Sequence, residues 1–182
     1  MCNKLTKQCR VCVSCHSSLR RVWWAGAYND ELKGVIAGIK LGRKRQGARQ
    51  IGEYLADLLP YLPESTLIVP VPTAPHRVRR RGFDQAVVLA KHFAKARGLA
   101  YVELLRRVSS ADQIGKRRSE RIKQMQYSFA LKSGIKSSHG SSVVLVDDVL
   151  TTGATLESAA RLLRGAGVAH VDAVVIARHL PK

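Results

Sequence analysis

Short apolar runs along the chain alternate with segments in which apolar residues recur at helical spacing. Extended segments are predicted at residues 22–28, 67–71, 101–105, 143–146 and 171–177, with a short piece around Phe129. Helices are predicted at residues 30–41, around 51–59, at 84–97 and at 156–163. Strands that alternate with helices are typical of a parallel sheet with right-handed crossovers. The pattern therefore predicts an α/β fold, an open parallel sheet flanked by helices, with its ligand at the C-terminal ends of the strands.

The length and composition fit one domain with a small appendage. The chain has 182 residues, of which 46% are hydrophobic, and this is enough for a sizeable core. We expect a short cysteine-rich segment at residues 1–21 and an α/β domain at residues 22–182. No apolar run approaches the roughly 18 residues of a membrane span, and the first residues do not resemble a signal peptide. A cytoplasmic protein without membrane insertion is the expectation.

The positive charge is unevenly distributed. The net charge is +18, from 31 basic and 13 acidic side chains. Beyond residue 140 the two kinds balance, so the excess lies in the first 140 residues, mainly at 40–49, 76–81 and 116–123. Such an excess attracts polyanions. Three interpretations stay open: a nucleic-acid surface, a site for a substrate with several phosphates, or a solvated basic face. Only 5% of the residues are aromatic, which does not favour a base-stacking platform.

All four cysteines lie in the first fifteen residues of the chain. In a reducing compartment this clustering favours metal binding over disulfides. Three of the thiolates could converge on a tetrahedral Zn²⁺ with a fourth ligand from the first cysteine or from His16. The overlapping spacing also occurs in iron–sulfur proteins, and a segment without a stable metal is the third alternative. The candidate zinc ligands are Cys2, Cys9, Cys12 and Cys15.

The strongest chemical signal follows the predicted strand at 143–146. Two acids come directly after it, then a loop of small and hydroxyl residues, then a helix. Free backbone N–H groups and the helix dipole at such a loop favour a phosphate, and a glycine lets the phosphate approach closely. Ionised carboxylates are acceptors only, which suits the vicinal hydroxyls of a ribose. This pattern predicts a sugar-phosphate site made of Asp147, Asp148, Thr151, Thr152, Gly153, Ala154 and Thr155.

Two basic segments are expected at the same site. The strand at 67–71 ends in a proline-rich turn that presents Thr73 and runs into an arginine cluster containing Arg79, Arg80 and Arg81. Guanidinium groups match phosphate oxygens, so this cluster suits a pyrophosphate, and an exposed basic turn is the alternative. The loop at 112–125 could close as a basic lid, or it could be a disordered surface loop. Its candidate catalytic residues, which would stabilise the charge of a leaving group, are Arg117, Arg118 and Arg121.

The segment at 143–155 closely resembles the phosphoribosyl pyrophosphate (PRPP) signature of type I phosphoribosyltransferases. Together with Val69-Pro-Val-Pro72, Arg80-Arg-Gly-Phe-Asp-Gln85 and the basic loop, it makes the chain resemble the competence protein F (ComF) family, from about residue 23 to 178. The resemblance implies a type I phosphoribosyltransferase fold, a zinc-binding N-terminus and an association with DNA uptake. It also implies that the two acids hold the ribose hydroxyls and that residues 151–155 hold the 5′-phosphate. Asp84 departs from the family, which usually has Asn at that position, and the cysteine segment is shortened.

Two functions follow as hypotheses. The first is Mg²⁺-dependent transfer of a phosphoribosyl group from PRPP with release of pyrophosphate, to an acceptor that the sequence does not identify. Mg²⁺ would be held mainly by pyrophosphate and ribose oxygens. The alternative is a non-catalytic accessory protein of DNA uptake that contacts single-stranded DNA and proteins of the competence machinery. In that alternative the pocket for PRPP or ribose 5-phosphate senses a metabolite or is a vestige.

Overall fold

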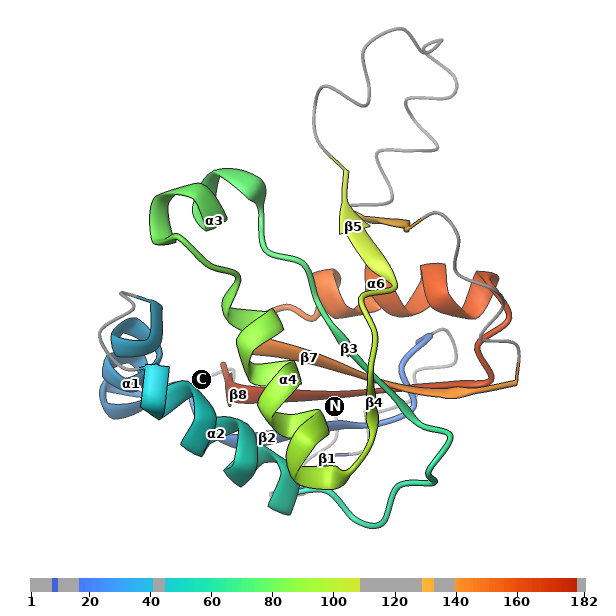
Figure 1. The fold of residues 1–182 in the computed structure, drawn as a ribbon, viewed down its shortest axis with the longest axis horizontal. Coiled ribbons are helices and arrows are strands. Elements are labelled where there is room, and N and C mark those ends of the chain that lie inside the picture. The colour runs from blue at the N-terminus through green and yellow to red at the C-terminus, as the bar shows by residue number, and fades with distance from the viewer. Residues whose placement is uncertain (1–7, 10–16, 41–44, 109–128, 133–139, 180–182) are drawn as a thin grey trace, which may run out of the picture.

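A computed structural model describes residues 8–9, 17–40, 45–108, 129–132 and 140–179. A six-stranded sheet lies at its centre (Figure 1). The order of its strands is β1 (Gln8–Cys9), β2 (Val22–Ala27), β8 (His170–Arg178), β7 (Ser142–Leu150), β3 (Leu67–Pro70) and β4 (Ala100–Tyr101). All neighbours from β2 to β4 are parallel, and β1 pairs antiparallel with β2. The predicted parallel α/β sheet is confirmed.

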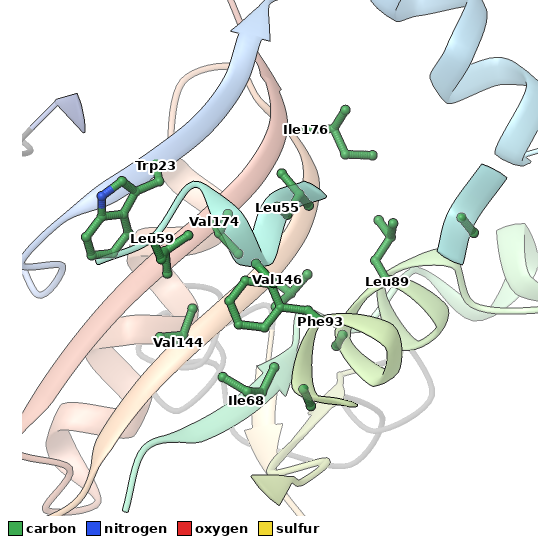
Figure 2. Close-up of a cluster of buried hydrophobic side chains, with 14 of the residues drawn as sticks. Trp23, Leu55, Leu59, Ile68, Leu89, Phe93, Val144, Val146, Val174 and Ile176 are labelled. Atoms are coloured by element: carbon green, nitrogen blue, oxygen red, sulfur yellow. The ribbon is translucent and has the colours of Figure 1, made fainter. Parts of the chain in front are cut away.

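Helices cover both faces of the sheet because the central strands are apolar on both sides. On one face, α1 (Asp30–Lys40), α2 (Arg45–Asp57) and α4 (Gln85–Arg97) enclose a core that contains Leu55, Phe93 and Val146 (Figure 2). On the other face, α6 (Ala154–Gly165) packs Leu163 against Leu145 and other strand residues. Within the described ranges, no helix has the length and apolar character that crossing a membrane requires.

The predicted limits of α4 agree with its capping groups. The carboxylate of Asp84 accepts a hydrogen bond from the backbone N–H of Ala86 at the N-terminus of the helix. At the other end Gly98 has a φ of 63°, a left-handed conformation that few other residues adopt without strain. Both signals are local, so the sequence alone was sufficient to place this helix.

The predicted strand at 101–105 was wrong in its extent, because the chain changes sheets there. β4 ends at Tyr101, and β5 (Leu105–Arg107) pairs antiparallel with β6 (Phe129–Leu131) in a separate two-stranded sheet. Leu104, Leu105 and Phe129 are all buried in the core beside α6, and this burial draws the chain away from the main sheet (Figure 1).

Two further segments differ from the prediction. The basic segment after β3 is a short helix, α3 (Pro75–Arg81), rather than a turn; a proline at its first position suits a helix start. The strand predicted at 143–146 continues to Leu150, because β7 stays paired with β8 as far as Arg178. The acidic pair therefore lies within β7 and not beyond its end.

Candidate active site at the carboxyl ends of the strands

Side chains along β7 alternate between the two faces of the sheet, and this alternation is interrupted at the acidic pair. Val144 and Val146 pack toward α2 and α4, but the next residue to pack on that side is Val149 and not Asp148. Leu150 then packs toward α6. Asp147 and Asp148 lie at this interruption, and both are partly exposed. Neither side chain belongs to either apolar cluster, and both lie at the carboxyl end of β7.

Burial and mutual repulsion oppose the ionisation of both carboxylates at the same time. Burial raises the pKa of Asp147 well above its usual value, and the negative charge of Asp148 raises it further. The backbone N–H of Asp148 donates to Oδ1 of Asp147 at 2.7 Å and counteracts part of this rise. Asp84 adds a smaller repulsion. Hydroxyl donors of a sugar, or a cation brought with the ligand, would relieve this repulsion.

The loop predicted to hold a phosphate links β7 to the N-terminus of α6. Gly153 precedes the helix with a φ of 81°, so a side chain at this position would strain the backbone. The first turn of the helix closes normally, with the N–H of Glu157 donating to the carbonyl of Gly153 at 2.9 Å. The N–H groups that precede this bond lie at the positive end of a twelve-residue helix. Four residues of the loop are exposed: Thr151, Thr152, Ala154 and Thr155.

The turn that follows β3 lies beside the acidic pair, because β3 and β7 are neighbouring strands. In this turn the backbone N–H and the hydroxyl of Thr73 both donate to the carboxylate of Asp84, each at 2.9 Å. Arg107, which lies further along the chain, donates to the carbonyl of Pro72 at 3.3 Å. The sequence predicted Thr73 at this edge but not the two side chains that hold its turn.

The predicted arginines are only partly described. In α3, Arg79 and Arg80 are exposed and Arg81 is partly exposed, and the helix stands out beyond the end of β3 (Figure 1). The exposure of Arg79 and Arg80 leaves them accessible to an anion. The three candidate lid residues, Arg117, Arg118 and Arg121, lie outside the described residues.

The predicted zinc site also lies outside the described residues, apart from the backbone of Cys9. Cys2, Cys12 and Cys15 are not described, and Cys9 belongs to β1, where it pairs with Val22. Among the residues that are described, no three His, Cys, Asp or Glu side chains form a group that could hold a metal ion.

Two residues that sequence reasoning missed are connected to this site. Arg107 stacks over the ring of Phe129, with its guanidinium carbon 5.2 Å from the ring centre, and contacts the turn after β3. Glu157 in the first turn of α6 accepts hydrogen bonds from the hydroxyl of Ser17 and the N–H of Ser18. An acid in the first turn of a helix is a recognisable signal, but its partners are 140 and 139 residues away in sequence.

Comparison with known protein families identifies a phosphoribosyl transferase domain in the chain. The phosphoribosyl transferase domain family matches residues 78–181, which is more than half of the chain. Two structures share the fold, each at 21% identity over 70% of this chain and 25% of the other chain. One is an allosteric regulatory enzyme of purine biosynthesis, with a TM-score of 0.52. The other is the glutamine PRPP amidotransferase of B. subtilis, with a TM-score of 0.51. They confirm the predicted phosphoribosyltransferase fold.

Relatives with similar sequences bear out the predicted resemblance to the ComF family. Competence protein ComFC of Streptococcus pneumoniae is 29% identical over 83% of this chain and 65% of the relative. Competence protein ComFC of Bacillus subtilis is 31% identical over 78% of this chain and 57% of the relative. DNA utilization protein YhgH of Salmonella typhi is 27% identical over 94% of this chain and 78% of the relative. The chain thus spans about two thirds or less of the two ComFC proteins.

Proposed function

Because the chain belongs to the phosphoribosyl transferase domain family, we propose that it binds PRPP or a ribose 5-phosphate at the ligand end of β3 and β7. One observation carries the proposal: an acidic pair, a helix N-terminus after a glycine loop and the turn at Thr73 lie together at this edge. Each group suits one part of the ligand. The acids accept hydrogen bonds from the ribose hydroxyls, and the loop donates to the 5′-phosphate.

The reaction that this arrangement supports is transfer of the phosphoribosyl group. A nucleophilic acceptor forms a bond to C1 of the ribose, and the bond from C1 to the pyrophosphate oxygen breaks. Pyrophosphate leaves with the electron pair, and the acceptor loses its proton to solvent or to the leaving group. The protein contributes positioning and positive charge near the pyrophosphate, from Arg79, Arg80, Arg81 and the arginines of the loop beyond β5. No described residue identifies the acceptor.

Mg²⁺ fits this site chemically, since Asp147 and Asp148 offer the oxygen ligands that this ion prefers. Phosphate and ribose oxygens of the ligand would complete its coordination. The ion would supply positive charge for the leaving pyrophosphate.

Calorimetry with ribose 5-phosphate, and with PRPP plus Mg²⁺, tests the proposal. The double variant Asp147→Asn/Asp148→Asn should bind both ligands at least about tenfold more weakly, because charged hydrogen bonds to the ribose are lost. Asp57→Asn, at an exposed position of α2, is the control for a change of charge and should bind as the wild type does. Equal affinity of wild type and double variant would contradict the site. Release of pyrophosphate with a panel of nucleobases and amines then tests transfer and identifies the acceptor.

A second function has its own supporting observation. None of the residues of α3 is buried, and the helix carries exposed Arg77, Arg79 and Arg80 at the ligand end of the sheet. Relatives are named for competence and DNA utilization. In this alternative the protein is a non-catalytic accessory of DNA uptake that contacts the phosphates of single-stranded DNA and works with other competence proteins. Because the same arginines serve both proposals, DNA and PRPP would compete.

A further inference from the structure

Two side chains from later in the sequence hold the turn between β3 and α3, one by accepting hydrogen bonds from it and one by donating to it. Asp84 accepts from the N–H of Thr73 through Oδ2 and from its hydroxyl through Oδ1, both at 2.9 Å. The same Oδ1 accepts from the N–H of Ala86 at 3.0 Å and caps α4. Arg107 donates to the carbonyl of Pro72. The carboxylate of Asp84 therefore satisfies three donors with two oxygens.

Both donors of Thr73 are already bonded to a carboxylate, which an anion at this turn would have to replace. The N–H and hydroxyl of Thr73 are two groups with which the turn could bind a phosphate, and both already donate to Asp84. The negative charge of Asp84 also contributes to the raised pKa of Asp147, after burial and the charge of Asp148. A pyrophosphate at the turn would have to displace Asp84 or accept its repulsion.

The phosphate loop is engaged less firmly: among the described residues, the N–H of Ala154 donates to the hydroxyl of Thr152 at 3.4 Å, a long bond to a neutral acceptor. Thr151, Thr152 and Thr155 are exposed at the N-terminus of α6. The carboxylate of Glu157 in the same helix accepts hydrogen bonds from Ser17 and Ser18, which precede β2. The two anion positions of the proposed site thus differ: the loop is open to a phosphate, and the turn is already occupied by a carboxylate.

From this difference we propose that Asp84 determines the specificity of the site, disfavouring a pyrophosphate at the turn relative to the 5′-phosphate at the loop. The inference rests on the proposed function, and it names the ligand class that the wild-type protein favours. That class is sugar phosphates without a pyrophosphate, such as ribose 5-phosphate. PRPP binds at the expense of the bonds between Asp84 and Thr73.

The variant Asp84→Asn separates the two anion positions. Its amide has one acceptor oxygen for three donors, so at least one donor of the turn is released, and the charge is removed. Asn caps a helix about as well as Asp, so α4 should keep its N-terminus. Calorimetry should show PRPP and inorganic pyrophosphate, each with Mg²⁺, binding about tenfold more tightly, as one gained charge-assisted hydrogen bond predicts. The affinity for ribose 5-phosphate should stay within about twofold of the wild type, because the loop keeps its donors.

The control and the second variant keep this test decisive. Asp57→Asn makes the same change of charge on α2, near the opposite end of α4, where Arg97 donates to the carbonyl of Ala56. It should alter neither affinity. If Asp84→Asn does not fold, Asp84→Ser also offers a capping oxygen without charge, and the same changes are expected. If the uncharged variant does not favour PRPP over ribose 5-phosphate more than the wild type does, the inference is overturned and the proposed function is unaffected. A wild-type protein that binds neither ligand would overturn the proposed function, and the inference with it.

Discussion

The hydroxyl of Ser17 donates a hydrogen bond of 3.0 Å to the carboxylate of Glu157, in the first turn of α6. The N–H of Ser18 donates to the same carboxylate at 2.9 Å. Glu157 lies four residues after Gly153, whose carbonyl accepts from the Glu157 N–H. The end of the cysteine-rich segment, residues 1–21, is thereby attached to the helix that carries the phosphate loop.

Removal of this attachment should lower the free energy of unfolding. Glu157→Ala removes the acceptor of two partly buried donors, so the free energy of unfolding should fall by about 1–3 kcal/mol. Glu157→Gln keeps one acceptor oxygen and should lose less. Urea denaturation measures both variants. Glu53→Ala removes an exposed carboxylate paired with Arg49 and should change stability by less than about 1 kcal/mol. An equal effect of Glu157→Ala and Glu53→Ala would show that the attachment contributes nothing.

Asp147 should destabilise the protein as the pH rises. Burial and the charge of Asp148 raise its pKa, so ionisation of Asp147 opposes folding. Its contribution to stability is complete below the pKa of an unfolded aspartate, about 4, and is lost as the pH rises through the folded-state pKa. Asp147→Asn should therefore exceed the wild type in free energy of unfolding at pH 8, by on the order of 1 kcal/mol, with no such gain below pH 4.

Urea denaturation of wild type and Asp147→Asn across this pH range measures the difference. Asp57→Asn, an exposed carboxylate on α2, serves as the control and should show a much flatter difference. If the difference in free energy of unfolding between Asp147→Asn and the wild type does not grow with pH, ionisation of Asp147 does not oppose folding.

Arg107 should support binding of PRPP more than binding of ribose 5-phosphate. Arg107→Met removes the hydrogen bond to the carbonyl of Pro72, in the turn after β3. It also removes the positive charge over the ring of Phe129. The affinity for PRPP with Mg²⁺ should fall about tenfold, the equivalent of one hydrogen bond from a charged group. Lys95→Met, at an exposed position of α4, should leave both affinities unchanged. An equal loss for both ligands would place the effect of Arg107 outside the turn.

Single-stranded DNA should bind through α3 if the second proposal is correct. Arg79→Gln/Arg80→Gln should weaken binding and make its log–log dependence on salt shallower by about 1.4, or 0.7 for each phosphate contact. Arg161→Gln, exposed on α6, should leave the slope unchanged. Fluorescence titrations with and without PRPP decide whether the ligands compete. DNA binding that PRPP does not affect would place the DNA surface away from the pocket, and no binding at low salt would exclude this function.

The cysteine-rich segment should hold one zinc per chain through Cys9, Cys12, Cys15 and Cys2. Metal analysis of protein purified without chelators should find about one equivalent of zinc, since tetrahedral zinc sites take four ligands. Cys12→Ser should lower this content. Zinc well below one equivalent would count against the site, and iron with visible absorbance would replace it with an iron–sulfur centre.

Local patterns in the sequence were sufficient for most strands of the main sheet and for the helices that cover it. The α4 limits follow from Asp84 and Gly98, and the strand–loop–helix around Gly153 follows from neighbouring residues. Such signals depend on contacts within a few residues, so they can be read before the chain is folded. The resemblance to a family then connected the motif to PRPP.

Contacts between distant residues were decided only by the tertiary structure. Pairing with β8 extends β7 through the acids, although their charge suggested that the strand would end before them. The bond between Thr73 and Asp84 spans 11 residues, that between Arg107 and Pro72 spans 35, and that between Ser17 and Glu157 spans 140. Burial of Leu104 and Phe129 turned β5 out of the main sheet. Each of these depends on which surfaces pack together, and a pattern of apolar positions along the chain does not specify partners at such separations.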